Sequence, residues 1–180
     1  RNGLGPEAWG PLLEKSLPQA DSVLGGLGAE LQGWLARIQA EWPQGLPTGQ
    51  IHADLFPDNV FFLNGEISGL IDFYFACTDI LAYDIAICLN AWCFETPGEL
   101  NVTRSRALLR GYQSVRPLFA AEIEALPVLA RGGAIRFLLT RLYDWLNRAP
   151  AALVTPKDPL DYYRRLRFHF AVSGAGAYGL

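Results

Sequence analysis

The chain has 180 residues, 51% of them hydrophobic, and a formal net charge of −3. A chain of this length can bury a sizeable core, so we expect residues 1–180 to form one globular domain. No apolar run approaches the roughly 20 residues that span a bilayer, and the first residues lack a signal peptide's apolar region. These features argue against a membrane protein and predict a cytoplasmic one.

The charge is distributed unevenly along the chain. Residues 1–100 contain 3 Lys and Arg against 13 Asp and Glu, a net −10, whereas residues 101–180 contain 12 against 5, a net +7. This asymmetry suggests cation binding in the first part and anion recognition in the second, unless the two parts simply pair or are solvated. Nucleic acid is a poor candidate partner, because the arginines are spread over several expected helices and the pI is acidic.

The three cysteines, Cys77, Cys88 and Cys93, have no C-x-x-C spacing, and the chain has only two histidines. We therefore expect reduced, buried thiols and no structural zinc site. Methionine is absent, which leads us to expect a fragment or a processed product.

The first half of the chain is expected to begin with helices. Residues 1–10 are rich in Gly and Pro and are expected to be linker-like. Apolar residues at helical spacing predict helices over residues 12–17 and 21–42. Residues 43–50 are then expected to form a loop.

A hairpin follows. The apolar, β-prone runs 60–63 and 66–73 flank Asn-Gly at 64–65, a pair that favours a type I′ turn because both central residues need positive φ. Such a hairpin brings Asn59 and Asp72 back to the same end of the strand pair.

The second half is expected to be helical. Four helices are predicted: residues 80–94 with Thr78 or Asp79 as the cap, a helix capped by Thr103, residues 122–147, and a helix from the Asp158-Pro159 cap to about 172. Pro127 and the Gly132-Gly133 pair predict that the third is broken in two. Residues 173–180 are expected to be mobile. The predicted fold class is α+β, mainly α, with helices packed around one small hairpin.

The chemistry is concentrated between residues 51 and 73. Phosphoryl transfer from a nucleotide needs a carboxylate for the attacking hydroxyl and oxygen ligands for Mg²⁺. Asp54 fits the first role, while Asn59 and Asp72 offer the hard oxygen donors that Mg²⁺ prefers. A glycosidase would need a second carboxylate where Asn59 stands.

Two neighbouring residues allow alternative interpretations. His52 could be a general base, but no Ser or Cys partner completes a triad, so a structural role that braces the loop is favoured. Asp58, next to Pro57, is interpreted as a turn residue, with a place near the metal as the alternative.

The motifs resemble those of a known superfamily. H-A-D-L-F-P-D-N-V, the hairpin and G-L-I-D-F are similar to the catalytic loop and metal motif of the aminoglycoside phosphotransferase and choline kinase superfamily. I-D-F-Y-F-A-C-T-D, R-F-L-L-T-R-L-Y-D-W and K-D-P-L-D-Y-Y resemble more narrowly the bacterial type II homoserine kinases. The resemblance implies the C-terminal lobe of a protein-kinase-like fold and ATP- and Mg²⁺-dependent phosphorylation of the side-chain hydroxyl of L-homoserine, in threonine biosynthesis.

The resemblance also implies residue roles. By it, Asp54 is the catalytic base, Asn59 and Asp72 bind Mg²⁺, and His52 anchors the loop. Asp84, within A-Y-D-I-A, matches a buried Asp that hydrogen-bonds the catalytic loop, as a buried carboxylate must.

The sequence departs from the family pattern in its nucleotide-binding parts. No G-x-G-x-x-G loop precedes the H-A-D-L-F-P-D-N-V motif, and the chain's two lysines, Lys15 and Lys157, lie on no expected strand. We therefore expect the N-terminal, nucleotide-clamping lobe to be absent and to act as a partner, and the chain alone to have negligible kinase activity.

The acceptor site is predicted from charge. Homoserine is a zwitterion, so its recognition needs a cation and acceptors. Arg141 and Asp144 lie on one helical face and are candidates for its two ends, with Tyr74, Trp92 and Arg136 as neighbours. The alternative is an intrahelical ion pair. Other acceptors (choline or ethanolamine, a sugar, an aminoglycoside) and a non-catalytic binding module remain open.

Overall fold

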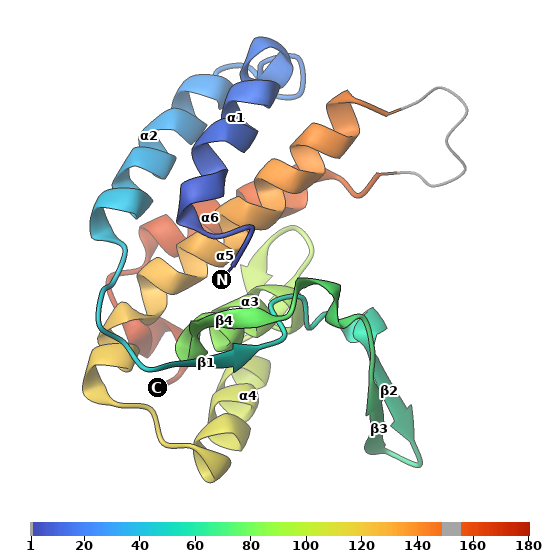
Figure 1. The fold of residues 1–180 in the computed structure, drawn as a ribbon, viewed down its shortest axis with the longest axis vertical. Helices are drawn as coiled ribbons and strands as arrows, with labels where there is room; N and C mark the ends of the chain where they lie inside the picture. Colours follow the sequence, from blue (N-terminus) through green and yellow to red (C-terminus); the bar gives the residue numbers. More distant parts are fainter. Residues whose placement is uncertain (1, 149–155) are drawn as a thin grey trace.

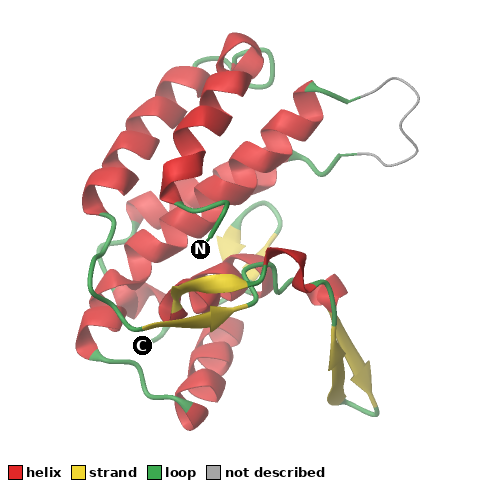
Figure 2. Cartoon of the chain, viewed as in Figure 1, coloured by secondary structure: helices red, strands yellow, loops and turns green. Residues whose placement is uncertain are grey.

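The structure, a computed structural model, describes residues 2–148 and 156–180, which form a mainly helical α+β fold with three small sheets (Figures 1 and 2). This confirms the predicted fold class. The helices are α1 (Pro6–Ala20), α2 (Leu27–Glu41), α3 (Leu81–Trp92), α4 (Val102–Val115), α5 (Ala120–Leu146) and α6 (Pro159–Ala171). The strands are β1 (Thr48–Ile51), β2 (Val60–Leu63), β3 (Glu66–Leu70), β4 (Cys77–Ile80), β5 (Phe94–Glu95) and β6 (Glu99–Leu100).

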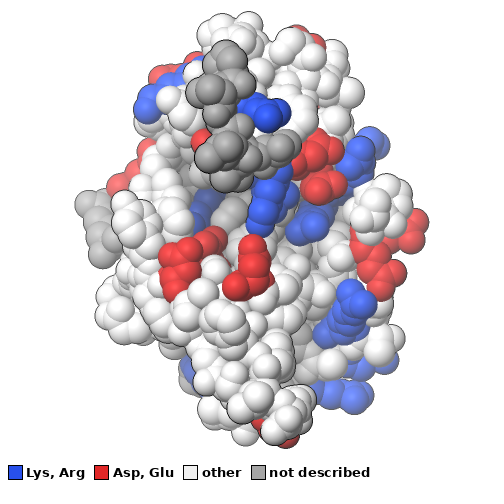
Figure 3. All heavy atoms as spheres, turned by 90° about the vertical axis from the view of Figure 1, so that its right-hand side faces the viewer, with Lys and Arg blue, Asp and Glu red and all other residues white. Residues whose placement is uncertain are grey.

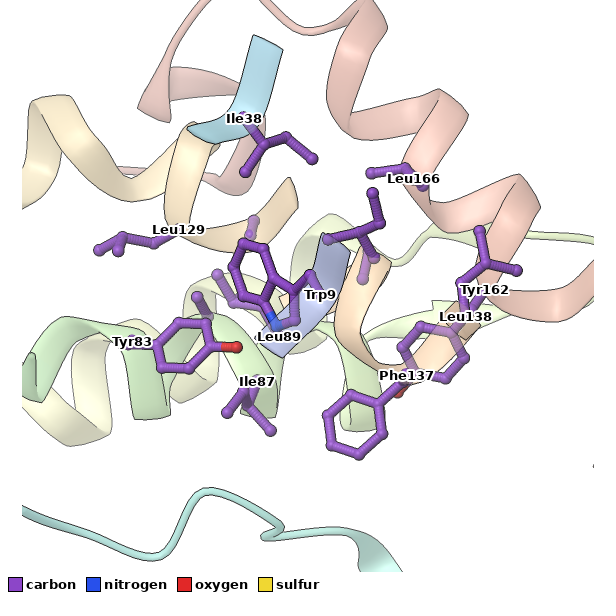
Figure 4. Packing of buried hydrophobic residues seen from close by; sticks show 14 of the residues in the cluster. Trp9, Ile38, Tyr83, Ile87, Leu89, Leu129, Phe137, Leu138, Tyr162 and Leu166 are labelled. Carbon is purple, nitrogen blue, oxygen red and sulfur yellow. The ribbon is translucent and has the colours of Figure 1, made fainter. Parts of the chain in front are cut away.

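The core forms around α5, which crosses the molecule against α1, α3 and α6 (Figure 1). Fully buried side chains from these helices include Trp9, Ile87, Leu138 and Leu166 (Figure 4). Burial of such a side chain stabilises the fold by about 1.5–3 kcal/mol. The site described below is therefore attached to a packed helical body.

The helix α5 is continuous, so the predicted break at Pro127 and the glycine pair is wrong. A proline inside a helix removes one backbone hydrogen bond, and the packing of a long buried helix can outweigh that loss. Gly132 lies against the ring of Trp42, where a Cβ atom would clash. The glycine pair therefore permits close packing and does not end the helix.

Both ends of the described chain are more ordered than predicted. Helix α1 begins at Pro6, so residues 6–10 are not linker, and Trp9 donates its indole N–H to the carbonyl of Leu4 at 2.8 Å. At the other end, a short 3₁₀ helix spans Ala175–Tyr178 and buries Tyr178, whose hydroxyl lies 2.9 Å from Nδ1 of His169. The predicted mobile tail is therefore anchored.

A two-stranded ribbon leads into the site, and the sequence did not predict it. Strand β1 pairs antiparallel with β4, with Ile51 opposite Cys77, where a loop and a helix cap were expected. Gln50 donates its side-chain N–H to the Thr78 hydroxyl at 2.9 Å. Thr78 and Asp79 are therefore strand residues, and α3 begins at Leu81.

The predicted helix caps are confirmed at one position and corrected at another. Asp158 accepts a hydrogen bond from the Leu160 amide at 2.8 Å and caps α6, as predicted. Asn101, not Thr103, caps α4, because its side-chain oxygen accepts the Arg104 amide at 3.0 Å.

The hairpin of β2 and β3 has the predicted turn, with φ of 54° at Asn64 and 85° at Gly65. Strand β3 ends at Leu70, before the predicted Phe73. The hairpin projects from the helical body (Figure 1). Many of its apolar side chains are exposed; Phe62, for example, is 56% exposed.

No helix in the described part of the chain combines the length and apolarity needed to cross a membrane. The three cysteines are free, as predicted, although only Cys93 is buried and the other two are partly buried.

Candidate active site

The loop that begins at the end of β1 is held by a carboxylate of α3. The amide of His52 donates to Oδ2 of Asp84 at 2.9 Å, and the amide of Ala53 donates to Oδ1 at 2.8 Å. Ala53 has a φ of 63°, an uncommon conformation for a residue with a side chain. The predicted hydrogen bonds between Asp84 and the loop are confirmed, and they hold the backbone just before Asp54.

His52 is buried and joins two separate segments. Its Nδ1 faces the amide of Asp54 at 3.3 Å, and its Nε2 lies 2.9 Å from the carbonyl oxygen of Ile71. Since an amide can only donate, Nδ1 accepts and Nε2 carries the proton that is donated to Ile71. Both nitrogens are thus engaged in bracing the loop against the residue that precedes Asp72.

Asn59 completes the connection between Asp54 and Asp72. Its side-chain N–H donates to the carbonyl of Asp54 at 2.8 Å, and its own carbonyl accepts the amide of Ile71 at 3.0 Å. Because the amide nitrogen is engaged, the side-chain oxygen of Asn59 is left as the atom for a ligand. Asp72 follows in the left-handed region, with φ of 60°.

Arg136 lies beneath the loop and is only 1% exposed. Its guanidinium donates to the carbonyl of Ala53 and packs on the rings of Phe75 and Phe137, 5.4 Å and 4.6 Å from their centres. It was expected beside the acceptor, but the structure instead buries it behind the catalytic loop, where it supports the backbone.

The predicted base and metal ligands, Asp54, Asn59 and Asp72, meet in one pocket of about 190 Å³. Figure 3 shows the side of the molecule that lies on the right in Figure 1, and near the middle of this side basic side chains lie next to acidic ones. The pocket is lined by Asp54, Phe56, Asp58, Asn59, Asp72, Phe137, Arg141 and Lys157. The hairpin therefore returns Asp72 to the side of Asn59, as its turn predicted.

Asp54 is partly buried, and burial raises the pKa of its carboxyl above the ordinary value. The positive charge of Arg136 acts in the opposite direction, and the negative charge of Asp72 raises the pKa further. A raised pKa makes a carboxylate a better proton acceptor, which suits a general base.

The donor set is compatible with a divalent cation. Asn59 and Asp72 supply two hard oxygen ligands at the pocket, and Mg²⁺ commonly binds through one or two protein groups together with substrate phosphates and water. Within residues 2–148 and 156–180, no three His, Cys, Asp or Glu side chains cluster as a metal site.

The acceptor candidates separate into those at the pocket and those away from it. Of the five, only Arg141 lines the pocket. Asp144 is exposed and makes no ion pair with Arg141 in the described structure, Tyr74 is 85% exposed, and Trp92 donates its indole N–H to the carbonyl of Leu55 at 2.7 Å. Trp92 thus braces the loop from α3.

Sequence reasoning missed three lining residues, Phe56, Phe137 and Lys157. Lys157 Nζ lies 3.5 Å from Oδ2 of Asp58, 99 positions earlier in the chain. Its position places it just before the Asp158 cap of α6, but a contact over this separation has no local pattern.

The fold and site agree with a family model. Residues 3–118 match the model described as phosphotransferase enzyme family. The chain belongs to this phosphotransferase family. Its matched region contains the catalytic loop, the hairpin and Asp84, so the predicted superfamily is confirmed on the segment that holds the site.

Named relatives extend the similarity to the whole chain. The homoserine kinase of Rhodospirillum rubrum is 63% identical over 180 residues, 100% of this chain and 56% of the relative. The homoserine kinase of Acidiphilium cryptum is 65% identical over 179 residues, 99% of this chain and 56% of the relative. The chain thus spans little more than half the length of these relatives.

A solved structure supports the fold. Plasmodium vivax ethanolamine kinase matches with a TM-score of 0.57 and 18% identity, over 89% of this chain and 48% of that chain. At this identity, the likeness concerns the fold alone, a kinase-like arrangement of which this chain forms about half.

Proposed function

We propose that this chain supplies the catalytic half of an ATP- and Mg²⁺-dependent kinase that phosphorylates the side-chain hydroxyl of L-homoserine, on the route to threonine. The observation that carries the proposal is the convergence of Asp54, Asn59 and Asp72 on one pocket. The 63% identity to a named homoserine kinase supports the choice of acceptor.

Each residue has a defined task in this proposal. Asp54 accepts a hydrogen bond from the acceptor hydroxyl, orients it and takes its proton as the phosphoryl group is transferred. Asn59 and Asp72 hold Mg²⁺, which when bound neutralises charge on the nucleotide phosphates. The carboxylate of Asp84, the imidazole of His52 and the guanidinium of Arg136 keep the loop in place.

The nucleotide requires a partner lobe in this proposal. This chain spans 56% of the length of the named homoserine kinases. Its hairpin exposes apolar side chains beside the pocket, including Phe61, Phe62, Leu63, Ile67 and Leu70. A surface of this kind is suited to a protein contact. We propose that the N-terminal lobe covers the hairpin and clamps ATP, and that the 180-residue chain alone has negligible activity.

The test uses the full-length enzyme with L-homoserine, ATP and Mg²⁺. Replacing Asp54 by Asn keeps the shape of the side chain but removes the base, so we expect kcat to fall about 100- to 10,000-fold. Glu14→Gln, an equivalent loss of charge on the exposed face of α1, is the matched control and should leave kcat unchanged. Full activity of the Asp54→Asn variant would contradict the proposed base.

A further inference from the structure

The pocket has two chemically different parts. Asp54, Asn59 and Asp72 make one part acidic and oxygen-rich, while Arg141 and Lys157 contribute two cations to the same small space. The metal and base roles proposed above use the acidic part. They leave the two cations without a task.

Arg141 differs from the other arginines that are shielded from solvent. In the described part of the chain, each of the others donates to an acceptor: Arg116 to Glu122, Arg131 to Glu41, Arg136 to Ala53, Arg164 to Asp161 and Arg165 to Asn90. Arg141 is partly buried on α5, yet its guanidinium makes no hydrogen bond or ion pair among the described residues. It packs on the ring of Tyr162, with the guanidinium carbon 4.4 Å from the ring centre, and the charges of Asp161 and Asp158 act on it without a hydrogen bond or ion pair.

A cation that has lost part of its hydration without gaining an anionic partner is in an unfavourable state. Burial lowers the pKa of Arg141, which reflects the same penalty on its charged form. An anion that enters the pocket would relieve this penalty and form charge-assisted hydrogen bonds with the guanidinium. Arg141 is therefore prepared for an anionic ligand group.

Lys157 lies over the same aromatic cluster. Its Nζ is 5.5 Å from the centre of the Phe56 ring, and Phe56 packs on Phe137 at 4.9 Å, which in turn packs on Tyr162 at 5.4 Å. Its ion pair with Asp58 is long, 3.5 Å, and the two side chains are 61% and 68% exposed. Such a pair contributes little stability, so Lys157 can exchange it for a ligand.

We propose that Arg141 and Lys157 bind a carboxylate of the acceptor, so that the site selects hydroxy acids and rejects amino alcohols that lack an acidic group. The inference rests on the proposed phosphoryl transfer, because the acceptor hydroxyl must at the same time reach Asp54. Asp58, released by Lys157, is then available for the ammonium group of an amino acid.

The experiment removes the carboxylate from the substrate and its partner from the enzyme. In the full-length enzyme, kcat/KM is measured for L-homoserine and for 3-aminopropan-1-ol, which is homoserine with hydrogen in place of the carboxylate. The variants are Arg141→Met, Arg141→Lys and Lys157→Met. Arg110→Met, at an exposed position on α4, is the matched control.

For Arg141→Met we expect kcat/KM for L-homoserine to fall about 10- to 100-fold, the usual range for a hydrogen bond to a charged group, with most of the change in KM. The value for 3-aminopropan-1-ol should stay within about threefold, since this acceptor has no group for Arg141 to bind. Arg141→Lys should recover part of the loss, and Lys157→Met should show a smaller, equally selective loss. A general disturbance of the fold would affect both acceptors alike.

An equal loss on both acceptors, or no loss on either, would overturn the inference. If the wild-type enzyme phosphorylates neither acceptor, the proposed function fails, and the carboxylate site is judged by calorimetric binding of L-homoserine. Binding by the wild type that is lost in Arg141→Met would still support the site, whereas equal binding, or none to the wild type, would overturn it.

Discussion

The loop of residues 51–59 and the hairpin that follows it are neighbours in the sequence, but they differ in how firmly they are attached to the helical body. The loop of residues 51–59 is tied to the helical body by Asp84, Arg136 and Trp92, which come from α3 and α5. The hairpin of β2 and β3 projects from that body and exposes apolar side chains. The residues of the proposed chemistry thus lie on the anchored part, and the hairpin carries the exposed apolar surface proposed to meet the partner lobe.

Removing the anchor of the loop should have the largest effect on stability. Asp84→Ala leaves the amides of His52 and Ala53 without their acceptor, and we expect the free energy of unfolding of this chain to fall by about 3 kcal/mol. Chemical denaturation measures the change. Asp161→Ala, which removes a half-exposed pair with Arg164, should change it by less than about 0.5 kcal/mol.

The stability of the helical body should also depend on pH through His169, which is fully buried and whose ring nitrogens contact Asn90 and Tyr178. Burial lowers its pKa from 6.5 to about 3. The unfolded chain therefore binds the proton more readily, so stability is complete above about pH 6.5 and decreases as the pH falls toward 3, by about 1.4 kcal/mol per pH unit for one proton.

The pH dependence is measured by denaturation of the wild type and His169→Gln between pH 7 and pH 3.5. The variant lacks the imidazole of His169. Its free energy of unfolding should therefore fall less steeply with decreasing pH than that of the wild type, whatever its value at pH 7. Parallel curves for the two proteins would exclude His169 as the cause.

A substitution in the turn of the hairpin should destabilise only the hairpin and not the helical body. Gly65 has a φ of 85°, which an alanine adopts at a cost of about 1 kcal/mol. In Gly65→Ala we expect amide exchange in β2 and β3 to rise about fivefold, the equivalent of that energy, while global stability stays unchanged. A matching loss of global stability would show that the hairpin folds as one unit with the body.

The smallest effect is expected on the exposed hairpin face. Phe62→Ser should change the free energy of unfolding of this chain by less than about 0.5 kcal/mol, because the side chain is 56% exposed. In the full-length enzyme the same substitution should lower stability measurably if the partner lobe covers this face. Equal effects in the two proteins would remove the hairpin from that contact.

Where an element depends on neighbours in the chain, the sequence predicted it well. The Asn64-Gly65 turn, the Asp158 cap and the cluster of Asp54 and Asn59 were all readable, because turn and cap preferences act over a few residues. Apart from the cap of α4, which is Asn101 and not the predicted Thr103, the main errors fell on elements whose state depends on distant partners. Strand β1 exists because β4 pairs with it, and α5 continues past its glycines because Trp42 packs on Gly132.

The sequence by itself determined the chemistry: which carboxylates, which amide and which family motifs this chain contains, since these follow from residue types and short spacings. Only the tertiary structure decided how the arginines of α5 divide their tasks. Arg136 is buried behind the loop, whereas Arg141, five positions later, lines the pocket and makes no hydrogen bond or ion pair with the described residues. Both are arginines on one helix. Segments far away in the chain pack around each of them, and these surroundings make one a structural support and the other a candidate binding residue.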